Sequence, residues 1–206
     1  MASFLQKARA AALVLSAAAL LAGSSVPAPA ASQRPPRGTI ILMRGLANVF
    51  SLGLDTLNDQ LHARGVSNSV VTSYSGWTDL ANHIASDYRR DRAHAAPIIL
   101  MGHSFGADAT LEIADQLAAQ NVPVALIVNF DAVSETVVPK NVAHVINFYE
   151  TNNNGLALTP GEGFKGKLEN IDVAKIDPEI GHLNIEKSPK LHARAIAAVL
   201  KVLHRS

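Results

Sequence analysis

The chain has 206 residues, of which 48% are hydrophobic and 17% are charged. This composition excludes an intrinsically disordered chain, and the length fits one domain with a sizeable core. The formal net charge is +1 and the basic residues form no long run, so the sequence does not indicate nucleic acid or an acidic membrane surface as a partner.

Residues 1–31 have the pattern of a secretory signal peptide. Lys7 and Arg9 precede an apolar run at 10–23, and the small residues 28–30 before Ala31 offer a cleavage site. An uncleaved N-terminal anchor is the alternative, although the run is short for a membrane span. We therefore expect an exported protein, periplasmic or secreted, with no membrane span once the signal is removed. Removal leaves a formal charge of 16 − 17, or −1, and the chain contains no cysteine for disulfides.

Residues 32–38 are expected to form an extended leader into one domain at 39–206. In that domain, short apolar runs alternate with segments whose apolar residues recur at helical spacing. The runs predict strands at 39–43, 69–74, 97–101, 122–130, 142–149 and 168–176. The helical segments predict helices at about 51–64, 75–92, 105–120 and 188–203. The polar segment 151–167 is expected to be a loop. This alternation predicts an α/β fold: a three-layer α/β/α sandwich around a mostly parallel sheet of about six strands.

One strand-to-helix junction carries the motif G-x-S-x-G. The apolar run 97–101 ends in Gly102, His103, Ser104, Phe105 and Gly106, and a helical pattern follows. Strand, tight turn and helix are the context of a nucleophile elbow, in which the serine hydroxyl stands above the sheet edge. His103, at the variable position, is expected to point elsewhere. The alternative interpretation is a glycine-rich turn in an ordinary α/β protein.

A serine hydroxyl becomes a strong nucleophile when a histidine takes its proton and a carboxylate orients that histidine. His182 is the favoured base because it lies in the loop after the last predicted strand. Asp131 ends the strand after the elbow helix and is the favoured acid, while Glu150 ends the next strand and is the alternative. Both would reach the same edge of a parallel sheet as the elbow. Asp172 and Asp177 are weaker candidates.

An oxyanion needs two hydrogen-bond donors close to the developing charge. The backbone N–H of Phe105, which follows the nucleophile, is one candidate. The N–H of Leu46, in the turn 44–47 after the first strand, is the other. Three aromatic residues are candidates for lining an acyl pocket: Trp77, Phe50 and Phe164.

Together these residues resemble the α/β-hydrolase superfamily, over Thr39 to Leu203. The resemblance rests on the elbow motif, the strand-end carboxylates and His182, which follow the family's order of serine, acid and histidine. It implies a compact lipase-, esterase- or thioesterase-like member that needs no metal or cofactor. Arg44-Gly45 departs from the His-Gly often found there. The usual N-terminal antiparallel strands and the room for a large lid are missing, which implies a minimal sheet and an open site.

The sequence therefore predicts hydrolysis of a carboxylic ester or thioester, with a small-molecule or lipid-like acyl substrate and an acyl-enzyme on Ser104. One alternative is a non-catalytic binding protein on the same fold, suggested by Arg44 in the oxyanion turn. Another is transfer of the acyl group to an alcohol or amine. A serine at the elbow argues against dehalogenation, which would use an aspartate there.

Overall fold

The computed structural model describes residues 37–46, 51–153 and 155–204. Six parallel strands form one sheet in the order β2-β1-β3-β4-β6-β8. The strands are β1 (Thr39–Arg44), β2 (Ser69–Ser73), β3 (Ile98–His103), β4 (Leu126–Phe130), β6 (His144–Tyr149) and β8 (Lys167–Asp172). The helices are α1 (Gly53–His62), α2 (Trp77–Arg90), α3 (Arg92–Ala95), α4 (Phe105–Ala119) and α5 (Pro189–Leu203).

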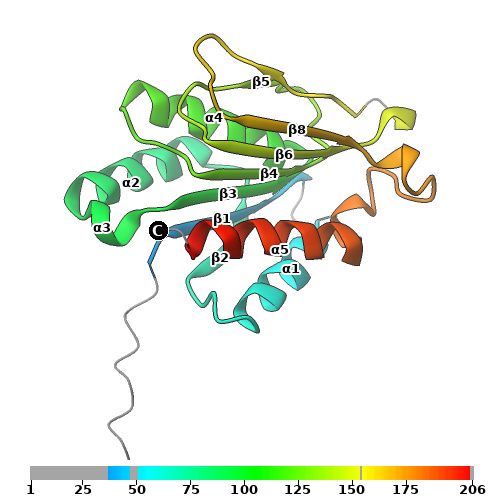
Figure 1. The fold of residues 1–206 in the computed structure, drawn as a ribbon, viewed down its shortest axis with the longest axis horizontal. Helices are drawn as coiled ribbons and strands as arrows, with labels where there is room; N and C mark the ends of the chain where they lie inside the picture. The colour runs from blue at the N-terminus through cyan, green and yellow to red at the C-terminus, as the bar shows by residue number, and fades with distance from the viewer. Residues whose placement is uncertain (1–36, 47–50, 154, 205–206) are drawn as a thin grey trace, which may run out of the picture. The chain divides into compact units, whose positions relative to one another are not determined.

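Helices cover both faces of the sheet, with α1 and α5 on one side and α2 and α4 on the other (Figure 1). The alternation of side chains along β1 explains why two cores form. Ile40 and Leu42 pack with the leucines of α1, whereas Ile41 and Met43 pack with α2 and α4. Because both faces are buried, the central strands are mostly apolar. The three-layer α/β/α sandwich predicted from the sequence is confirmed.

The strand order reverses next to β1. The chain places β2 on one side of β1 and then β3 on the other, so α1 and α2 cover opposite faces, as right-handed crossovers require. In open parallel sheets, the crevice outside the carboxyl ends of the strands at such a reversal is the usual ligand site. The turn after β1 and the elbow after β3 both lie at this point.

A row of asparagines crosses the neighbouring strands β4, β6 and β8; Asn129 and Asn147 are buried, and Asn170 on the edge strand is exposed. Asn129 pairs in register with Asn147, and Asn147 with Asn170. The Asn147 amide donates to Asn170 Oδ1 and to the carbonyl of Leu156, and the Asn170 side chain bonds both backbone groups of Leu158. The row therefore ties the segment after β6 to the sheet.

Three of the predicted strands and loops differ in detail from the structure. The fourth strand begins at Leu126 rather than at residue 122, and Val124 makes only an isolated bridge to Val142. The sixth strand ends at Asp172 because Val173–Lys175 forms a 3-10 turn. The segment expected to be a loop, 151–167, contains β7 (Thr159–Pro160), which pairs with β5 (Val137–Val138), and the 3-10 turn Thr151–Asn153. A further 3-10 turn, Ile185–Lys187, precedes α5.

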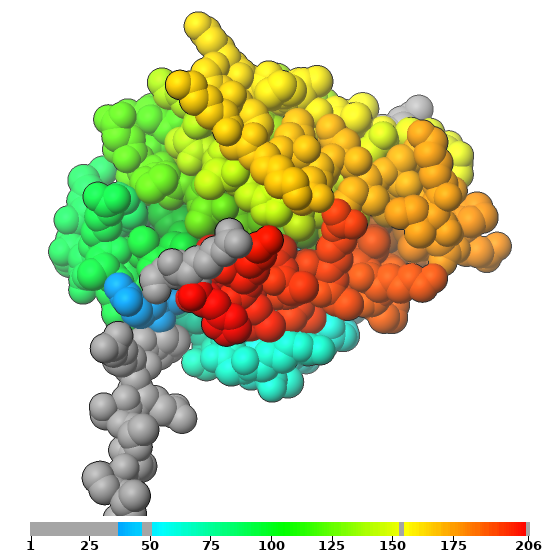
Figure 2. Space-filling model, viewed as in Figure 1, coloured from blue at the N-terminus to red at the C-terminus, as the bar shows by residue number. Residues whose placement is uncertain are grey.

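The described residues all belong to one compact unit, Pro35–Ser206. Figure 2 shows α5 lying along one face of this unit, with the segment after β8 at one end of it. The predicted signal peptide and most of the leader lie outside the described residues. In the part of the chain that the structure describes, none of the helices combines the length and apolarity needed to cross a membrane.

Candidate active site

The candidate site lies where the carboxyl ends of the parallel strands meet at one edge of the sheet. Leu46 follows β1, Ser104 follows β3 and Asp131 follows β4. His182 comes from the loop between β8 and α5. Parallel pairing therefore brings together residues that are far apart in the sequence.

The elbow places Ser104 in a conformation that few residues adopt. Its φ is +58°, outside the favoured regions for residues with a Cβ, which costs about 1–3 kcal/mol. Gly102 and Gly106 allow the tight turn, because a Cβ on Gly102 would overlap the carbonyl of Gly106 and a Cβ on Gly106 would overlap that of Met43. The Ser104 carbonyl then accepts the first helical hydrogen bonds, so α4 starts directly behind the serine.

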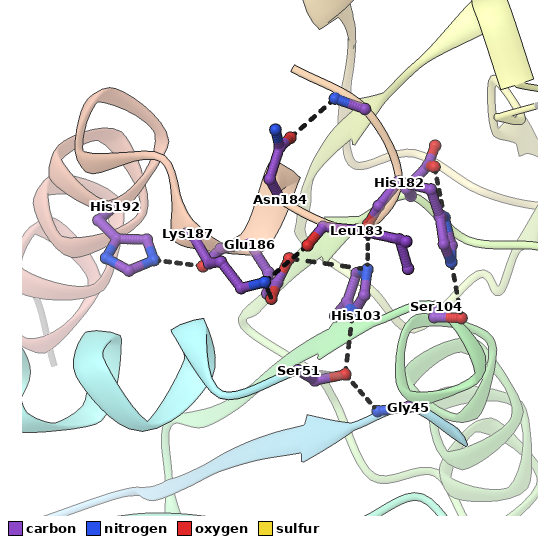
Figure 3. Close-up of polar contacts among 12 residues, drawn as sticks. Gly45, Ser51, His103, Ser104, His182, Leu183, Asn184, Glu186, Lys187 and His192 are labelled. Atoms are coloured by element: carbon purple, nitrogen blue, oxygen red, sulfur yellow. Dashed lines mark hydrogen bonds and ion pairs between the residues drawn. The ribbon is translucent and has the colours of Figure 1, made fainter. Parts of the chain in front are cut away.

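Ser104, His182 and Asp131 form one hydrogen-bonded chain. His182 Nε2 lies 3.1 Å from Ser104 Oγ (Figure 3). His182 Nδ1 lies 2.7 Å from Asp131 Oδ2. Both distances are within the range for proton transfer through a hydrogen bond. A proton on Nδ1 satisfies Asp131 and leaves Nε2 free to accept the serine proton.

The Asp131 carboxylate is buried and held on its second oxygen as well. Asp131 has φ +56° at the end of β4, and its Oδ1 accepts a hydrogen bond of 3.0 Å from the backbone N–H of Glu150. The Glu150 carboxylate accepts instead from the backbone N–H of Asn152. Of the two predicted acids, Asp131 is thus the one whose carboxylate the structure brings to His182, and Glu150 supports Asp131 through its backbone.

The two weaker carboxylate candidates have other partners. Asp172 accepts from the hydroxyl of Thr151 and pairs with Lys175. Asp177 accepts from the backbone N–H of Glu179. Both therefore stabilise the segments around them.

The environment of His182 favours its charged form. The hydrogen bond with Asp131 raises the pKa of His182 above its ordinary value of 6.5, partial burial opposes the shift, and the negative charge of Asp131 adds to it. Glu186 and Glu150 contribute in the same direction. A base with a raised pKa holds an abstracted proton better, which suits general base catalysis.

The turn after β1 stands beside Ser104 and is fixed from two directions. Arg44 makes a two-point ion pair with Asp55 in the first turn of α1, so its guanidinium is engaged away from the nucleophile. The Gly45 N–H donates to Ser51 Oγ at 2.9 Å. The next N–H along the chain is that of Leu46, the predicted oxyanion donor. The N–H of Phe105 is in the first turn of α4, where no intrahelical acceptor exists.

A cavity of about 410 Å³ opens above Ser104 and His182. Its rim is apolar, and four of the eight large hydrophobic side chains that are exposed among the described residues line it. These four are Leu46, Phe105, Val133 and Leu183. The wall beneath them is completed by Ser51 and His103. An apolar cavity with a few convergent polar groups is the usual form of a small-molecule site.

A scan against models of known protein families gave no match, and a search of curated proteins gave none either.

The aromatic residues predicted to line an acyl pocket lie elsewhere or outside the described residues. Trp77 and Phe164 pack against the core on the α2 and α4 side, and Trp77 lines a different cavity. Phe50 lies outside the described residues. The aromatic side chain at the site is Phe105, which stacks on Tyr74 with ring centroids 5.6 Å apart.

Two residues that the sequence analysis did not assign to the site support it. Asp108, in the first turn of α4, accepts the backbone N–H groups of residues 133–135 and so holds the rim loop that carries Val133. The sequence feature that could have indicated Asp108 is an acidic residue directly after the elbow motif.

His103 does point away from the serine hydroxyl, but its ring lies 5.0 Å from that of His182. The sequence feature that could have indicated His103 is a histidine at the end of an apolar strand.

Among the described residues, no group of three or more histidine, aspartate or glutamate side chains is arranged to hold a metal ion.

Proposed function

We propose that this protein is a serine hydrolase of the α/β-hydrolase superfamily that cleaves carboxylic esters or thioesters. The observation that carries the proposal is the hydrogen-bonded chain from Ser104 Oγ through His182 to Asp131. A nucleophile, a base and an orienting carboxylate in this order perform acyl transfer on several unrelated folds. The strained elbow that presents Ser104 supports the same conclusion.

In the proposed reaction, Ser104 Oγ attacks the acyl carbon while its proton passes to His182 Nε2. Asp131 keeps the Nδ1 proton of His182 in place and stabilises the imidazolium. Negative charge develops on the former carbonyl oxygen, close to the N–H groups of Phe105 and Leu46. When the intermediate collapses, the bond to the leaving oxygen or sulfur breaks and His182 gives that atom its proton.

Water completes the cycle on the acyl-enzyme. His182 takes a proton from the water as its oxygen attacks the acyl carbon, and then returns this proton to Ser104 as the carboxylic acid leaves. The apolar rim above Ser104 favours substrates with an apolar acyl or alkyl portion, because burying such groups against it removes apolar surface from water.

A fluorophosphonate probe tests the proposal directly. The protein should be labelled covalently, with the adduct on Ser104 in peptide mass spectrometry, and Ser104→Ala should abolish labelling and ester turnover. Ser75→Ala is the matched control, because Ser75 is exposed and bonds the hydroxyl of Ser73. Absence of labelling in the folded protein, or labelling that survives Ser104→Ala, would refute the proposal. Product analysis with added alcohols separates hydrolysis from acyl transfer.

The export of the protein remains a prediction from residues 1–31. N-terminal sequencing of the protein recovered from the periplasm or medium of an expressing bacterium tests it. A mature chain that begins near Ala31 is expected, and a cell-associated chain that keeps Met1 would contradict it.

A further inference from the structure

His103 is a buried imidazole that bridges two parts of the site without touching the serine hydroxyl. It ends β3, is 1% exposed and is bonded on both ring nitrogens. Nε2 lies 2.8 Å from the backbone carbonyl oxygen of His182, and Nδ1 lies 2.8 Å from Ser51 Oγ (Figure 3). Neither bond is needed to hold β3 in the sheet.

The partners of His103 fix which nitrogen carries the proton. A carbonyl oxygen only accepts hydrogen bonds, so Nε2 must donate to His182. Burial lowers the pKa of His103 to about 4, which leaves the ring neutral at pH 7 and Nδ1 without a proton. Nδ1 therefore accepts from the hydroxyl of Ser51, and the Ser51 oxygen in turn accepts from the N–H of Gly45.

These three hydrogen bonds connect the two parts of the site that must be aligned for acyl transfer. At one end is Gly45, next to Leu46 and its proposed oxyanion donor. At the other end is the backbone of His182, the proposed base. The two ends come from opposite halves of the chain, and His103 joins them directly behind Ser104. Misplacement of a catalytic group by about 1 Å can cost about 100-fold in rate.

We propose that His103, acting through Ser51, is a positioning residue that holds the oxyanion turn and the His182 loop in the alignment needed for the reaction. The inference rests on the proposed hydrolase function and gives a role to two further residues, His103 at the variable position of the elbow motif and Ser51 outside it. The buried Glu186 carboxylate lies 4.0 Å from His103 Nε2. Lys187 Nζ lies 3.6 Å from Glu186 Oε1. Glu186 and Lys187 belong to the same loop as His182.

Variants that keep only one of the two His103 hydrogen bonds separate the contribution of the Ser51 bond from that of the His182 bond. His103→Asn retains an acceptor near the Nδ1 position, and His103→Gln reaches toward the His182 carbonyl with its amide. His103→Leu removes both hydrogen bonds. We expect kcat to fall 10- to 100-fold in His103→Leu with KM within about twofold, because alignment acts on the transition state. The Asn and Gln variants should lose less than the Leu variant.

Ser51→Ala tests the link between the two ends. If His103 acts through Ser51, the double variant Ser51→Ala/His103→Leu should be no slower than His103→Leu alone, since residues of one network are not additive. Independent, multiplying losses would contradict the link. His192→Asn is the matched control, because His192 is also 1% exposed and also bonds a backbone carbonyl, that of Glu186. It should lower the melting temperature similarly and change kcat by less than twofold.

A measurement on the wild-type protein keeps the inference testable if the His103 variants do not fold. Long-range ¹H–¹⁵N NMR spectra of the histidine rings at pH 7 should show His103 neutral with its proton on Nε2. A proton on Nδ1, a charged ring, or His103→Leu with unchanged kcat would overturn the inference. Failure of the hydrolase proposal is distinguishable, since it would appear as absent turnover and absent Ser104 labelling in the wild type.

Discussion

Two cavities of this protein differ in what surrounds them. The larger, about 590 Å³, lies beside α4 and the short strands β5 and β7. Its wall carries four carboxylates and a lysine among apolar side chains: Glu112, Asp115, Glu135, Glu162 and Lys140. The smaller, about 410 Å³, has an apolar rim and the Ser104–His182 pair at its base. Volume alone would select the larger cavity, which lacks the Ser104–His182 pair.

The polar groups of the smaller cavity are connected by hydrogen bonds, whereas, among the described residues, the larger cavity carries several unconnected charges. In the larger cavity, burial and the neighbouring carboxylates Glu135 and Asp108 raise the pKa of Glu112, so the acids there repel one another. In the smaller cavity, every polar group from Ser104 to Asp131 has a partner that organises it. Substitutions in the two cavities should therefore have very different effects on turnover.

The largest effect is expected from the acid beneath the smaller cavity. Asp131→Asn preserves the shape of the side chain but favours the wrong proton arrangement on His182, and kcat should fall by about 10⁴-fold. Glu150→Gln should lose less than about tenfold, because its support for Asp131 comes from the backbone N–H. Steady-state turnover of a short-chain ester measures both. Equal losses in the two variants would contradict the assignment of Asp131.

The pH dependence of kcat/KM should report the raised pKa of His182. His182 must be unprotonated to act as a base, so activity is lost as the pH falls through its pKa. Because that pKa is raised, the acidic midpoint should lie above 6.5, and each further pH unit below it should cost about tenfold. A pH–rate profile with constant ionic strength checks this. A midpoint below 6.5 would show that the Asp131 bond does not govern the base.

The apolar rim should affect substrate binding more than chemistry. Leu183→Ser removes an apolar group that is 63% exposed at the mouth of the smaller cavity. For esters with longer acyl chains, KM should rise about three- to tenfold with kcat nearly unchanged, in line with the loss of about 1 kcal/mol of apolar contact. Ile176→Ser is the control, because Ile176 is 61% exposed and is not among the residues lining this cavity. Equal effects of the two variants would show that the apolar rim does not take part in substrate recognition.

The smallest effect is expected in the larger cavity. Glu112→Gln or Glu135→Gln removes a mutually repelling charge, so kcat/KM should change by less than twofold and the melting temperature should stay the same or rise slightly. Turnover and thermal unfolding of each variant measure this. A loss above tenfold would mean that the larger cavity contributes to the reaction.

The sequence predicted the existence and order of the central strands because both faces of the sheet are covered. β1, β3, β4 and β6 are buried on both sides and mostly apolar, although β4 begins four residues later than predicted. The edge strand β8 is only half-buried, so its sequence is mixed and its end was misplaced. β5 and β7 have two residues each, and a strand of two residues is too short to show the alternation of apolar and polar residues.

The candidate site was predictable as far as local sequence and chain order reach. The elbow is a contiguous motif, and His182 follows from its position after the last strand. The choice between Asp131 and Glu150 depends on backbone geometry, because both follow strands that end at the same edge. The sequence favoured Asp131, and the positive φ of Asp131 and its contact with His182 are the geometric features that separate it from Glu150. The contact between His103 and Ser51 spans 52 residues and depends on how the loops fold over the sheet edge.

The asparagine row across β4, β6 and β8 has a consequence for how the chain selects its strand pairing. A slip of one residue in β6 would turn Asn147 to the opposite face of the sheet and leave buried amides without partners. Each such amide would cost about 1–3 kcal/mol, whereas valine and isoleucine neighbours tolerate many pairings. Asn129 lies two residues before Asp131, and Asn147 three before Glu150. The bonds of Asn147 to Asn170 and Leu156 thus favour the β6 pairing in which the Glu150 N–H meets the Asp131 carboxylate, which links the pairing of the sheet to the assembly of the acid's environment.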